Sequence, residues 1–262
     1  MPPSVLNREC SVLLGDCRSI IPRQGTFDFI FADPPFNIGQ KYSGYSDKVA
    51  VAEYASFFRL WITQCWNALE PRGVLALHGH DDLVHIYLKM STQIRMTKIA
   101  WVNWHYRFGQ CSRSNWIDAR CHCLIFAKDP RNFTWNSEAV LVDSDRKTKY
   151  NDKRIHDTDH GGQRLPGTVW GIPSDGPYWG RVQGNSEERQ PDCPNQLPEV
   201  YLARLLKAYT NKGDRVLDPF GGSGTTSVVA KQLGRRVVTC DISPRNVEII
   251  EARLEKGTIR KF

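Results

Sequence analysis

A glycine-rich segment near the carboxyl end constrains the fold of this chain more than any other stretch. It reads Asp218-Pro219-Phe220-Gly221-Gly222-Ser223-Gly224-Thr225-Thr226, follows an apolar run at 215–218 and precedes a helical pattern at 225–232. Glycines at such a junction let the backbone turn sharply and approach a ligand without a side chain in the way. The segment predicts a strand–turn–helix unit that faces a small molecule, although a plain tight turn would use the same glycines.

Apolar runs and amphipathic stretches alternate along most of the 262 residues. The apolar runs predict strands at 12–14, 27–32, 74–78, 99–102, 121–127, 215–218 and 236–241. Apolar spacings of three and four residues predict helices at 53–69, 82–90, 201–209, 225–232 and 244–255. Strands that alternate with helices are typical of an α/β fold with a mostly parallel sheet.

From about residue 129 to residue 194 the apolar periodicity fades, and Gly, Pro, Asp, Arg and Asn dominate. We therefore expect a main domain formed by residues 1–132 and 191–262, and a loop-rich insert at 133–190. Aromatic side chains within the insert are expected to anchor it to the main domain: Trp135, Trp170, Tyr178 and Trp179. A basic cluster also lies within it: Arg146, Lys147, Lys149, Lys153 and Arg154.

Composition narrows the class of protein. The net charge is +7, which favours an anionic partner such as nucleic acid without requiring one. No apolar stretch approaches the length of a membrane span, and the amino end lacks the pattern of a secretion signal, so a cytoplasmic location is expected. The eight cysteines include no Cys-x-x-Cys pair, and those at Cys121 and Cys123 lie in an apolar run. Reduced structural thiols are therefore expected, and no metal site.

A carboxylate follows the next strand after the glycine segment. The apolar run 237–240 ends at Asp241, where an acid can accept hydrogen bonds from the ribose hydroxyls of a nucleoside cofactor. A phosphate-binding P-loop would need Lys after Gly224, and a dinucleotide site would need a third glycine where Ser227 stands. S-adenosylmethionine carries no phosphate, so this cofactor needs only the close turn and the acid.

A second motif, Asp33-Pro34-Pro35-Phe36, follows the strand predicted at 27–32. Two successive prolines cannot continue a strand ladder, so the chain leaves the sheet there. The motif offers the Asp33 carboxylate and the Pro34 carbonyl as two acceptors for the hydrogens of an exocyclic amino group, and the Phe36 ring as a face for a base rotated out of the duplex. A strand-ending turn capped by Asp33 is the alternative.

Together the two motifs resemble those of the DNA amino-methyltransferases, and their order, with the catalytic motif before the cofactor loop, is similar to the β group of that family. The resemblance covers residues 14 to about 254. It implies a mostly parallel seven-stranded methyltransferase sheet, circularly permuted, S-adenosylmethionine as cofactor and double-stranded DNA as partner. It also makes a homodimer plausible. Residues 133–190 are the candidate for recognition of the target sequence, where the basic cluster either contacts phosphates or is a solvated charged loop.

The resemblance also implies roles for single residues. Phe220, Gly222 and Gly224 match the loop around the methionine part of the cofactor, and Asp241 matches the ribose-binding acid. Asp16 matches an acid that approaches the cofactor's adenine. Residues 194–198 are similar to the family's segment before the glycine loop, but its His is absent and Leu197 replaces its Lys. Only the side-chain amides of Asn195 and Gln196 therefore carry over, as ligands of the cofactor's carboxylate. The full predicted cofactor set is Asp16, Asp33, Asn195, Gln196, Asp218, Phe220, Gly221, Gly222, Ser223, Gly224, Thr225 and Asp241.

The predicted reaction is direct methyl transfer to an exocyclic amino group, with catalytic residues Asp33, Pro34, Pro35 and Phe36. Asp in the first position is commoner among the adenine enzymes of the family, which favours adenine N6 over cytosine N4. Methylation of RNA or of protein glutamine, and a non-catalytic DNA-binding relative, are the alternatives. An aromatic loop on the target-base side is expected at Trp104, His105 or Tyr106, although Trp104 could equally pack in the core.

Overall fold

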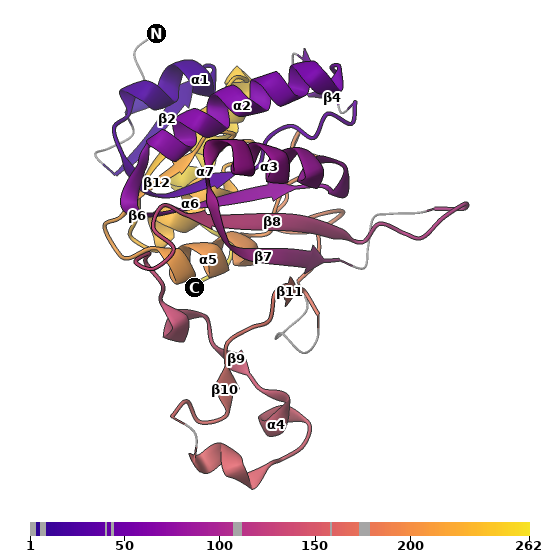
Figure 1. The fold of residues 1–262 in the computed structure, drawn as a ribbon, viewed down its shortest axis with the longest axis vertical. Helices are drawn as coiled ribbons and strands as arrows, with labels where there is room; N and C mark the ends of the chain where they lie inside the picture. The colour runs from indigo at the N-terminus through magenta and orange to yellow at the C-terminus, as the bar shows by residue number, and fades with distance from the viewer. Residues whose placement is uncertain are drawn as a thin grey trace.

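One central sheet organises the protein, for which the computed structural model describes residues 4–5, 9–39, 41–42, 45–106, 112–157, 159–172 and 179–262 (Figure 1). Within these ranges the sheet has nine strands in the order β1-β2-β13-β12-β3-β6-β8-β7-β11. Their bounds, in that order, are Ser4–Val5, Cys10–Leu14, Arg236–Asp241, Arg215–Asp218, Phe27–Ala32, Leu69–Gly79, Arg120–Ala127, Thr97–His105 and Val169–Trp170.

The seven inner strands match the number that the family resemblance implies. The strands β2, β13, β12, β3 and β6 pair in parallel, and β8 runs antiparallel between β6 and β7. The two-residue strands β1 and β11 extend its edges. This arrangement confirms the predicted α/β fold with a mostly parallel sheet.

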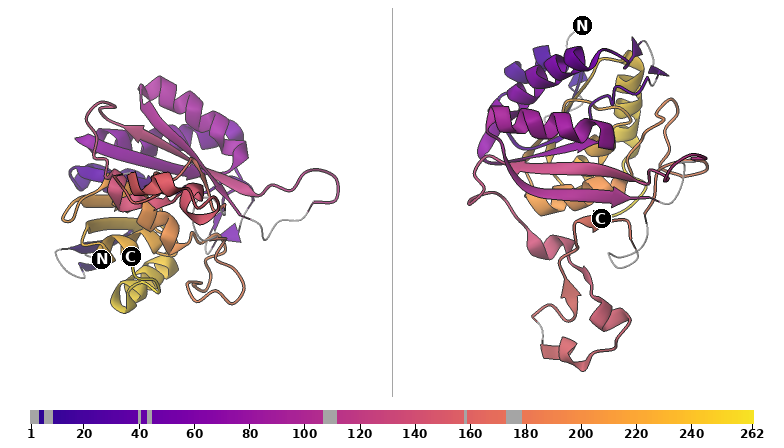
Figure 2. Two further views of the ribbon diagram at one scale, coloured as in Figure 1. Left: turned by 90° about the horizontal axis from the view of Figure 1, so that it is seen from below. Right: turned by 45° about the vertical axis from the view of Figure 1, so that its right-hand side comes forward.

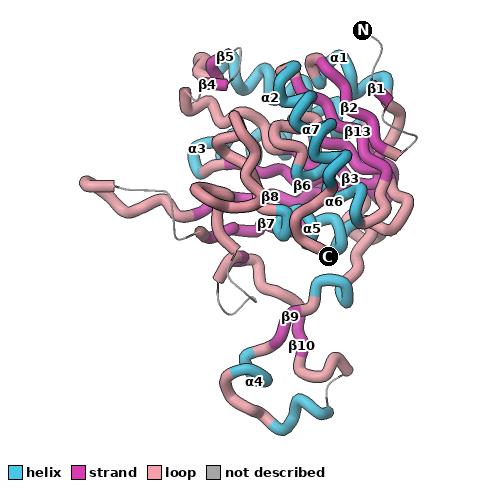
Figure 3. Tube along the Cα trace, turned by 180° about the vertical axis from the view of Figure 1, so that it is seen from behind, coloured by secondary structure: helices cyan, strands magenta, loops and turns pink. Residues whose placement is uncertain are grey.

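Helices cover both faces of the sheet because its strands are apolar on both sides. In β3, Phe29 and Phe31 point to one face, and Ile30 and Ala32 to the other. The first face packs against α5 (Glu199–Tyr209), α6 (Thr225–Gln232) and α7 (Pro244–Lys256), and the second against α1 (Cys17–Ile20), α2 (Val51–Asn67) and α3 (Asp81–Ile94) (Figures 1 and 3). None of the helices in the described ranges is long and apolar enough to cross a membrane.

Part of the insert projects from this body as a small lobe (Figures 1 and 2). Its neck is a two-stranded ladder in which β9 (Val142–Asp143) pairs with β10 (Gln163–Arg164). The lobe contains α4 (Asp145–Thr148) and a 3-10 helix at Lys153–Asp157. After the neck the chain returns to the body, where Trp170 and Trp179 are buried in the core. Trp135 is half-exposed and its ring contacts Tyr209, whereas Tyr178 lies outside the described residues.

Two smaller features complete the fold. A long arm joins β7 to β8, and residues 112–119 of it are described (Figure 1). A short antiparallel pair, β4 (Lys41–Tyr42) and β5 (Tyr45–Ser46), follows the catalytic motif predicted from sequence. Because β2, β13, β12 and β3 are parallel neighbours, their carboxyl ends meet at one edge of the sheet. The acids predicted at those ends are therefore brought to one place.

Candidate active site

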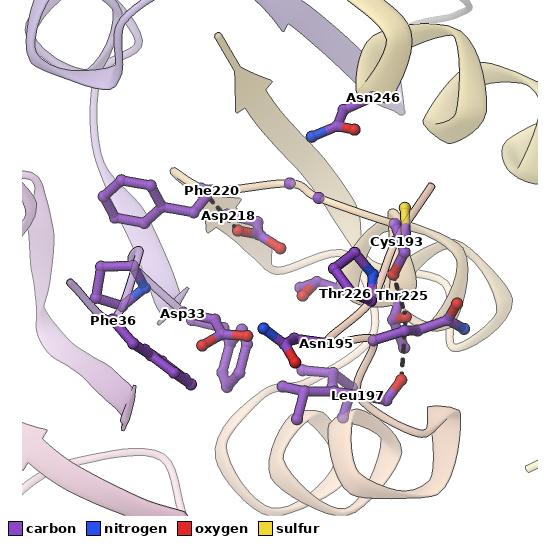
Figure 4. Close-up of a pocket in the computed structure, with 18 of the residues that line it drawn as sticks. Asp33, Phe36, Cys193, Asn195, Leu197, Asp218, Phe220, Thr225, Thr226 and Asn246 are labelled. Atoms are coloured by element: carbon purple, nitrogen blue, oxygen red, sulfur yellow. Dashed lines mark hydrogen bonds between the residues drawn. The ribbon is translucent and has the colours of Figure 1, made fainter. Parts of the chain in front are cut away.

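Two adjoining cavities lie at this edge of the sheet. The first encloses about 780 Å³ of empty space, part of it open to solvent, and the second about 880 Å³. Both are lined by Asp33, Phe220, Gly222 and Asn246, so they meet where β3 and the glycine loop face each other. The motif at 33–36 and the glycine loop, which are far apart in sequence, thus share one site (Figure 4).

Most of the predicted site residues line one or both cavities. Those in the first are Asp33, Pro34, Phe36, Asn195, Gln196, Asp218, Phe220, Gly221, Gly222, Ser223 and Thr225. Those in the second include Asp16, Pro35 and Asp241. Gly224 lies behind the loop as the N-cap of α6. The predicted DNA-contacting residues lie in the projecting lobe instead.

The glycine loop needs glycine for two separate reasons. Gly222 and Gly224 have φ angles of 51° and 76°, a region that favours glycine. Gly221 has no room for a side chain, because a Cβ there would lie 2.4 Å from Cγ2 of Thr239 on β13. The loop is therefore packed tightly against its neighbouring strand, and its backbone is exposed to the cavities.

Asp241, at the carboxyl end of β13, lines the second cavity and is hydrogen-bonded to this loop. Its Oδ2 accepts a hydrogen bond from the Gly222 amide at 2.8 Å, and its Oδ1 accepts one from the Ser243 amide at 2.8 Å. Burial raises the pKa of the Asp241 carboxyl, and the backbone amides oppose that rise. The Asn246 side chain, which lines both cavities, also hydrogen-bonds this carboxyl, so several donors hold Asp241 at the edge of the second cavity.

Asp33 presents an unusual buried carboxyl. Its Oδ1 is buried and has no hydrogen-bond partner among the described residues. Burial raises the pKa of Asp33 well above the ordinary value, and the nearby Asp218 carboxylate raises it further. Asp33 and Asn195 point toward one another across the first cavity (Figure 4). A buried acceptor without a partner is destabilising, and a donor from a ligand would relieve that destabilisation.

Neighbouring contacts fix the rest of the motif at 33–36. The Tyr54 hydroxyl donates to the Pro35 carbonyl at 2.8 Å, which ties the two prolines to α2. The Phe36 ring lies 6.2 Å from that of His78 and 6.4 Å from that of His80, measured between centroids. Phe36 thus lies near two imidazole rings while it lines the first cavity.

Asp218 is deeply buried at the end of β12, with only 3% of its surface exposed. It accepts hydrogen bonds from the Phe220 amide at 3.0 Å and from the Thr226 side chain. Burial nevertheless raises its pKa from 3.8 to about 6. The folded protein therefore holds this proton more tightly than the unfolded chain does.

Replacing Asp218 by Asn should make the protein less sensitive to rising pH. Because the folded pKa lies above the unfolded one, Asp218 lowers stability as the pH rises from about 4 to about 6. A shift of that size corresponds to about 3 kcal/mol of unfolding free energy. Asp218→Asn should thus gain stability relative to the wild type over this range, as measured by urea unfolding. Asp82→Asn, which changes an exposed acid, is the control, and a pH-independent Asp218→Asn difference would contradict the interpretation.

Two other predicted ligands have their polar groups engaged within the protein. Asp16 is the N-cap of α1, and its carboxylate pairs with Arg18, whose hydrogen bonds lower the Asp16 pKa. The Gln196 side chain donates to the Glu188 carbonyl at 2.6 Å and accepts from the Gln190 amide at 2.8 Å. Both ends of the Gln196 amide thus hold the cavity wall, and Asn195 is the amide that points into the cavity (Figure 4).

The aromatic and histidine residues near the site are largely structural. Trp104 is buried in the core and its indole N–H donates to the Trp179 carbonyl at 3.3 Å. His78 is buried at the end of β6, bonded to the Tyr201 hydroxyl at 3.0 Å, and burial lowers its pKa to about 3. No cluster of metal-ligating side chains occurs among the described residues. The described cysteines carry no disulfide.

Sequence reasoning missed two features. One is Trp116 on the arm, whose side chain is 91% exposed; an aromatic residue within a polar stretch of sequence could have indicated it. Arg253 and Glu199 are buried in a charge network beside the glycine loop. Their signal was a charged residue on the apolar face of a predicted helix, since Arg253 shares its face with Ile249, Ile250 and Leu254 in α7.

The chain is similar in sequence to known DNA methyltransferases. Type II methyltransferase M.HpaI of Haemophilus parainfluenzae is 29% identical over 233 residues, covering 88% of this chain and 69% of that protein. DNA adenine methyltransferase YhdJ of Escherichia coli K12 is 27% identical over 238 residues, covering 87% of this chain and 76% of that protein.

Solved structures share its fold. The PvuII DNA methyltransferase (cytosine-N4-specific) has a TM-score of 0.69 at 15% identity, covering 95% of this chain and 94% of that one. The M1.HpyAVI–SAM complex has a TM-score of 0.63 at 17% identity, covering 94% and 98%. A family model described as DNA methylase matches residues 27–252, the span that holds both motifs. The chain belongs to this family of DNA amino-methyltransferases, in the β group, whose catalytic motif precedes the glycine loop.

Proposed function

We propose that this protein transfers a methyl group from S-adenosylmethionine to N6 of adenine in double-stranded DNA. The observation that carries the proposal is the buried Asp33 oxygen without a partner among the described residues, placed where the two cavities meet beside Gly222. An acceptor there can grip an amino hydrogen of the target while the donor occupies the neighbouring space. Catalysis by positioning of this kind needs no covalent enzyme intermediate.

The second cavity suits the nucleoside part of the cofactor. Asp241 would accept from the ribose hydroxyls, and Phe57 and Ile242 supply apolar walls for the adenine near Asp16. The first cavity would hold the methionine part between Asn195 and the glycine loop. When bound, the cofactor supplies a methyl group on a cationic sulfonium. Asp33 and Asp218, whose carboxyl pKa values are raised, suit that positive charge, because a nearby cation favours their ionised forms.

The target base would enter beside Phe36. A base inside a duplex is inaccessible, so it must rotate out of the stack, at a cost of a few kcal/mol. Phe36 offers a ring for stacking, and Asp33 with the Pro34 carbonyl offers two acceptors for the amino hydrogens. The Asp in this motif and the relative named as an adenine methyltransferase favour adenine N6, whereas the structural neighbour named as cytosine-N4-specific keeps cytosine N4 as the second candidate.

The test is to incubate unmethylated genomic DNA with the protein and S-adenosylmethionine, digest the DNA to nucleosides and identify the product by mass spectrometry. N6-methyladenine is the expected product, and Asp33→Ala protein is the control. N4-methylcytosine would overturn the choice of base. Methylation of RNA or protein but not DNA would overturn the substrate class, and cofactor binding without transfer to any of them would indicate a non-catalytic relative.

Two surfaces are candidates for contact with the duplex. In the lobe, Lys147 and Lys149 are exposed but lie 2.9 and 3.3 Å from Asp143 and Asp145. Arg154 likewise pairs with Asp152. Such exposed pairs contribute little to stability, so phosphates can compete for these side chains. On the arm, the exposed Trp116 offers a ring for stacking on a base rather than a charge.

These two surfaces should differ in their dependence on salt. Changing both Lys147 and Lys149 to Gln should reduce the slope of log affinity against log salt by about one for each phosphate that is no longer neutralised. Trp116→Ala should weaken DNA binding about tenfold at every salt concentration and leave the slope unchanged. Fluorescence anisotropy with a labelled duplex measures both. Lys89→Gln, an exposed lysine on α3, is the control, and slopes equal to that of the control would exclude the lobe.

A further inference from the structure

Charged side chains lie buried behind the first cavity, where the mechanism above does not use them. Glu188, Glu199 and Arg253 are 3%, 0% and 4% exposed, and Arg260 reaches them from the chain's last residues. We call these four residues the charge network. Burying charges is unfavourable unless they are paired and hydrogen-bonded. The hydrogen bonds of the network show which parts of the site it joins.

Arg253 connects α7 to the glycine loop. One guanidinium nitrogen donates to the Ser223 carbonyl at 2.8 Å and to the Thr225 hydroxyl at 3.1 Å. The other donates to a Glu199 carboxylate oxygen at 3.0 Å. Ser223 and Thr225 both line the first cavity. The Arg253 guanidinium, which lines neither cavity, therefore holds the glycine loop through the Ser223 carbonyl and the Thr225 hydroxyl.

Glu188 connects the wall of the first cavity at residues 192–197 to Glu199. Its carboxylate accepts from the Glu199 amide at 2.8 Å, and its carbonyl accepts from the Gln196 side chain at 2.6 Å. Residues 192–197 form that wall of the first cavity. Both walls around the methionine end are thus connected to one residue, Glu199, at the start of α5.

The chain's last residues close the network. The amides of Ile259 and Arg260 donate to the Glu199 carboxylate at 3.1 and 3.0 Å, and the Arg260 side chain pairs with Glu188. The Glu199 carboxylate is therefore neutralised by one cation and further hydrogen-bonded by two amides. This satisfies a charge that has no exposure to solvent.

We propose that Arg253 is a positioning residue, which with Glu199 sets the spacing between the glycine loop and the wall at 192–197 that the methionine part of S-adenosylmethionine requires. The inference rests on the proposed cofactor but not on the proposed DNA target. A purely stabilising role fits the geometry less well, because a buried ion pair is no better for stability than an apolar pair of similar size. The Arg253 guanidinium instead directs two of its hydrogen bonds to groups of the cofactor loop.

The experiment compares two variants that separate stability from positioning. Arg253→Met leaves Glu199 buried without its cation, so its melting temperature should fall. The double variant Arg253→Met/Glu199→Gln removes both charges and should recover most of that loss. Both should bind S-adenosylmethionine and S-adenosylhomocysteine at least about tenfold more weakly than wild type by calorimetry without DNA. The kcat at saturating cofactor should change much less than KM for the cofactor.

Lys256→Met is the matched control, because it removes a positive charge from an exposed position on the same helix. Wild-type cofactor affinity in the double variant would overturn the proposal. If the double variant does not fold, Arg253→Lys is the second test, because it keeps the charge with fewer hydrogen-bond donors. It should bind cofactor about threefold more weakly at an unchanged melting temperature. Unchanged cofactor affinity of Arg253→Lys would also overturn the proposal. A wild-type protein that binds no cofactor would instead overturn the proposed function.

Discussion

An Asp33→Asn enzyme should lose about a thousandfold of kcat and remain folded. The substitution keeps the shape of the side chain but removes its charge and replaces one of its two acceptor oxygens with an amide donor, which repels the amino hydrogens of the target. Removing a positioned proton acceptor or an electrostatic contact at a reacting centre costs about a hundredfold to ten-thousandfold. Stability should not fall, because burial and the Asp218 carboxylate already disfavour the charged form of Asp33.

Single-turnover methylation measures the loss in kcat, and calorimetry with S-adenosylhomocysteine measures the cofactor site separately. That product is uncharged at sulfur, so its affinity should stay within about twofold of the wild-type value, since no charge–charge attraction is removed. Asp82→Asn, an exposed acid at the start of α3, controls for the loss of a negative charge. An Asp33→Ala enzyme has no side-chain acceptor at this position, and wild-type turnover by that variant would exclude Asp33 from the reaction.

An Asp241→Ala protein should bind S-adenosylmethionine at least about a hundredfold more weakly. The change removes the acceptor for two ribose hydroxyls, and hydrogen bonds to a charged group contribute about 1.5 to 3 kcal/mol each. It also leaves the amides of Gly222 and Ser243 without their partner, which loosens the glycine loop. Affinity for both S-adenosylmethionine and S-adenosylhomocysteine should fall, which distinguishes this variant from Asp33→Asn.

Asp241→Asn separates the two effects. Its amide oxygen can still accept from one backbone amide, so the loop is partly held while the charge is removed. We expect an intermediate loss of cofactor affinity, measured by calorimetry on the folded protein. An Asp241→Ala protein that keeps wild-type affinity would show that the second cavity does not hold the ribose.

The regular elements were predictable from sequence because their periodicity is local. The predicted bounds of β3, α6 and β13 agree with the structure. The strand β6 begins five residues earlier than predicted, because Pro71 and Gly73 in its first part resemble chain breakers. That part lies at a register shift in its pairing with β3, where the ladder tolerates them. The neck strands β9 and β10 are two residues each, too short for any periodic pattern.

The site was predictable only where its residues are consecutive in the chain. The motif at 33–36 and the loop at 218–226 carry their chemistry in short segments, and the family resemblance supplied their relation. The partners of Gln196 were not predictable, because Glu188 reaches it through a turn that leaves no pattern. The same holds for Arg253, whose contacts with Ser223 and Glu199 join segments 30 and 54 residues away.

The two-residue neck of the lobe allows the sequence beyond it to vary without disturbing the sheet. Because Val142 lies opposite Arg164 and Asp143 opposite Gln163, the lobe leaves and rejoins the body at a single point. Lengthening a loop that closes on itself costs little free energy, about 0.6 kcal/mol for each doubling. The residues beyond the neck can therefore be exchanged as a cassette, while the strand ends that hold the acids of the site stay where they are.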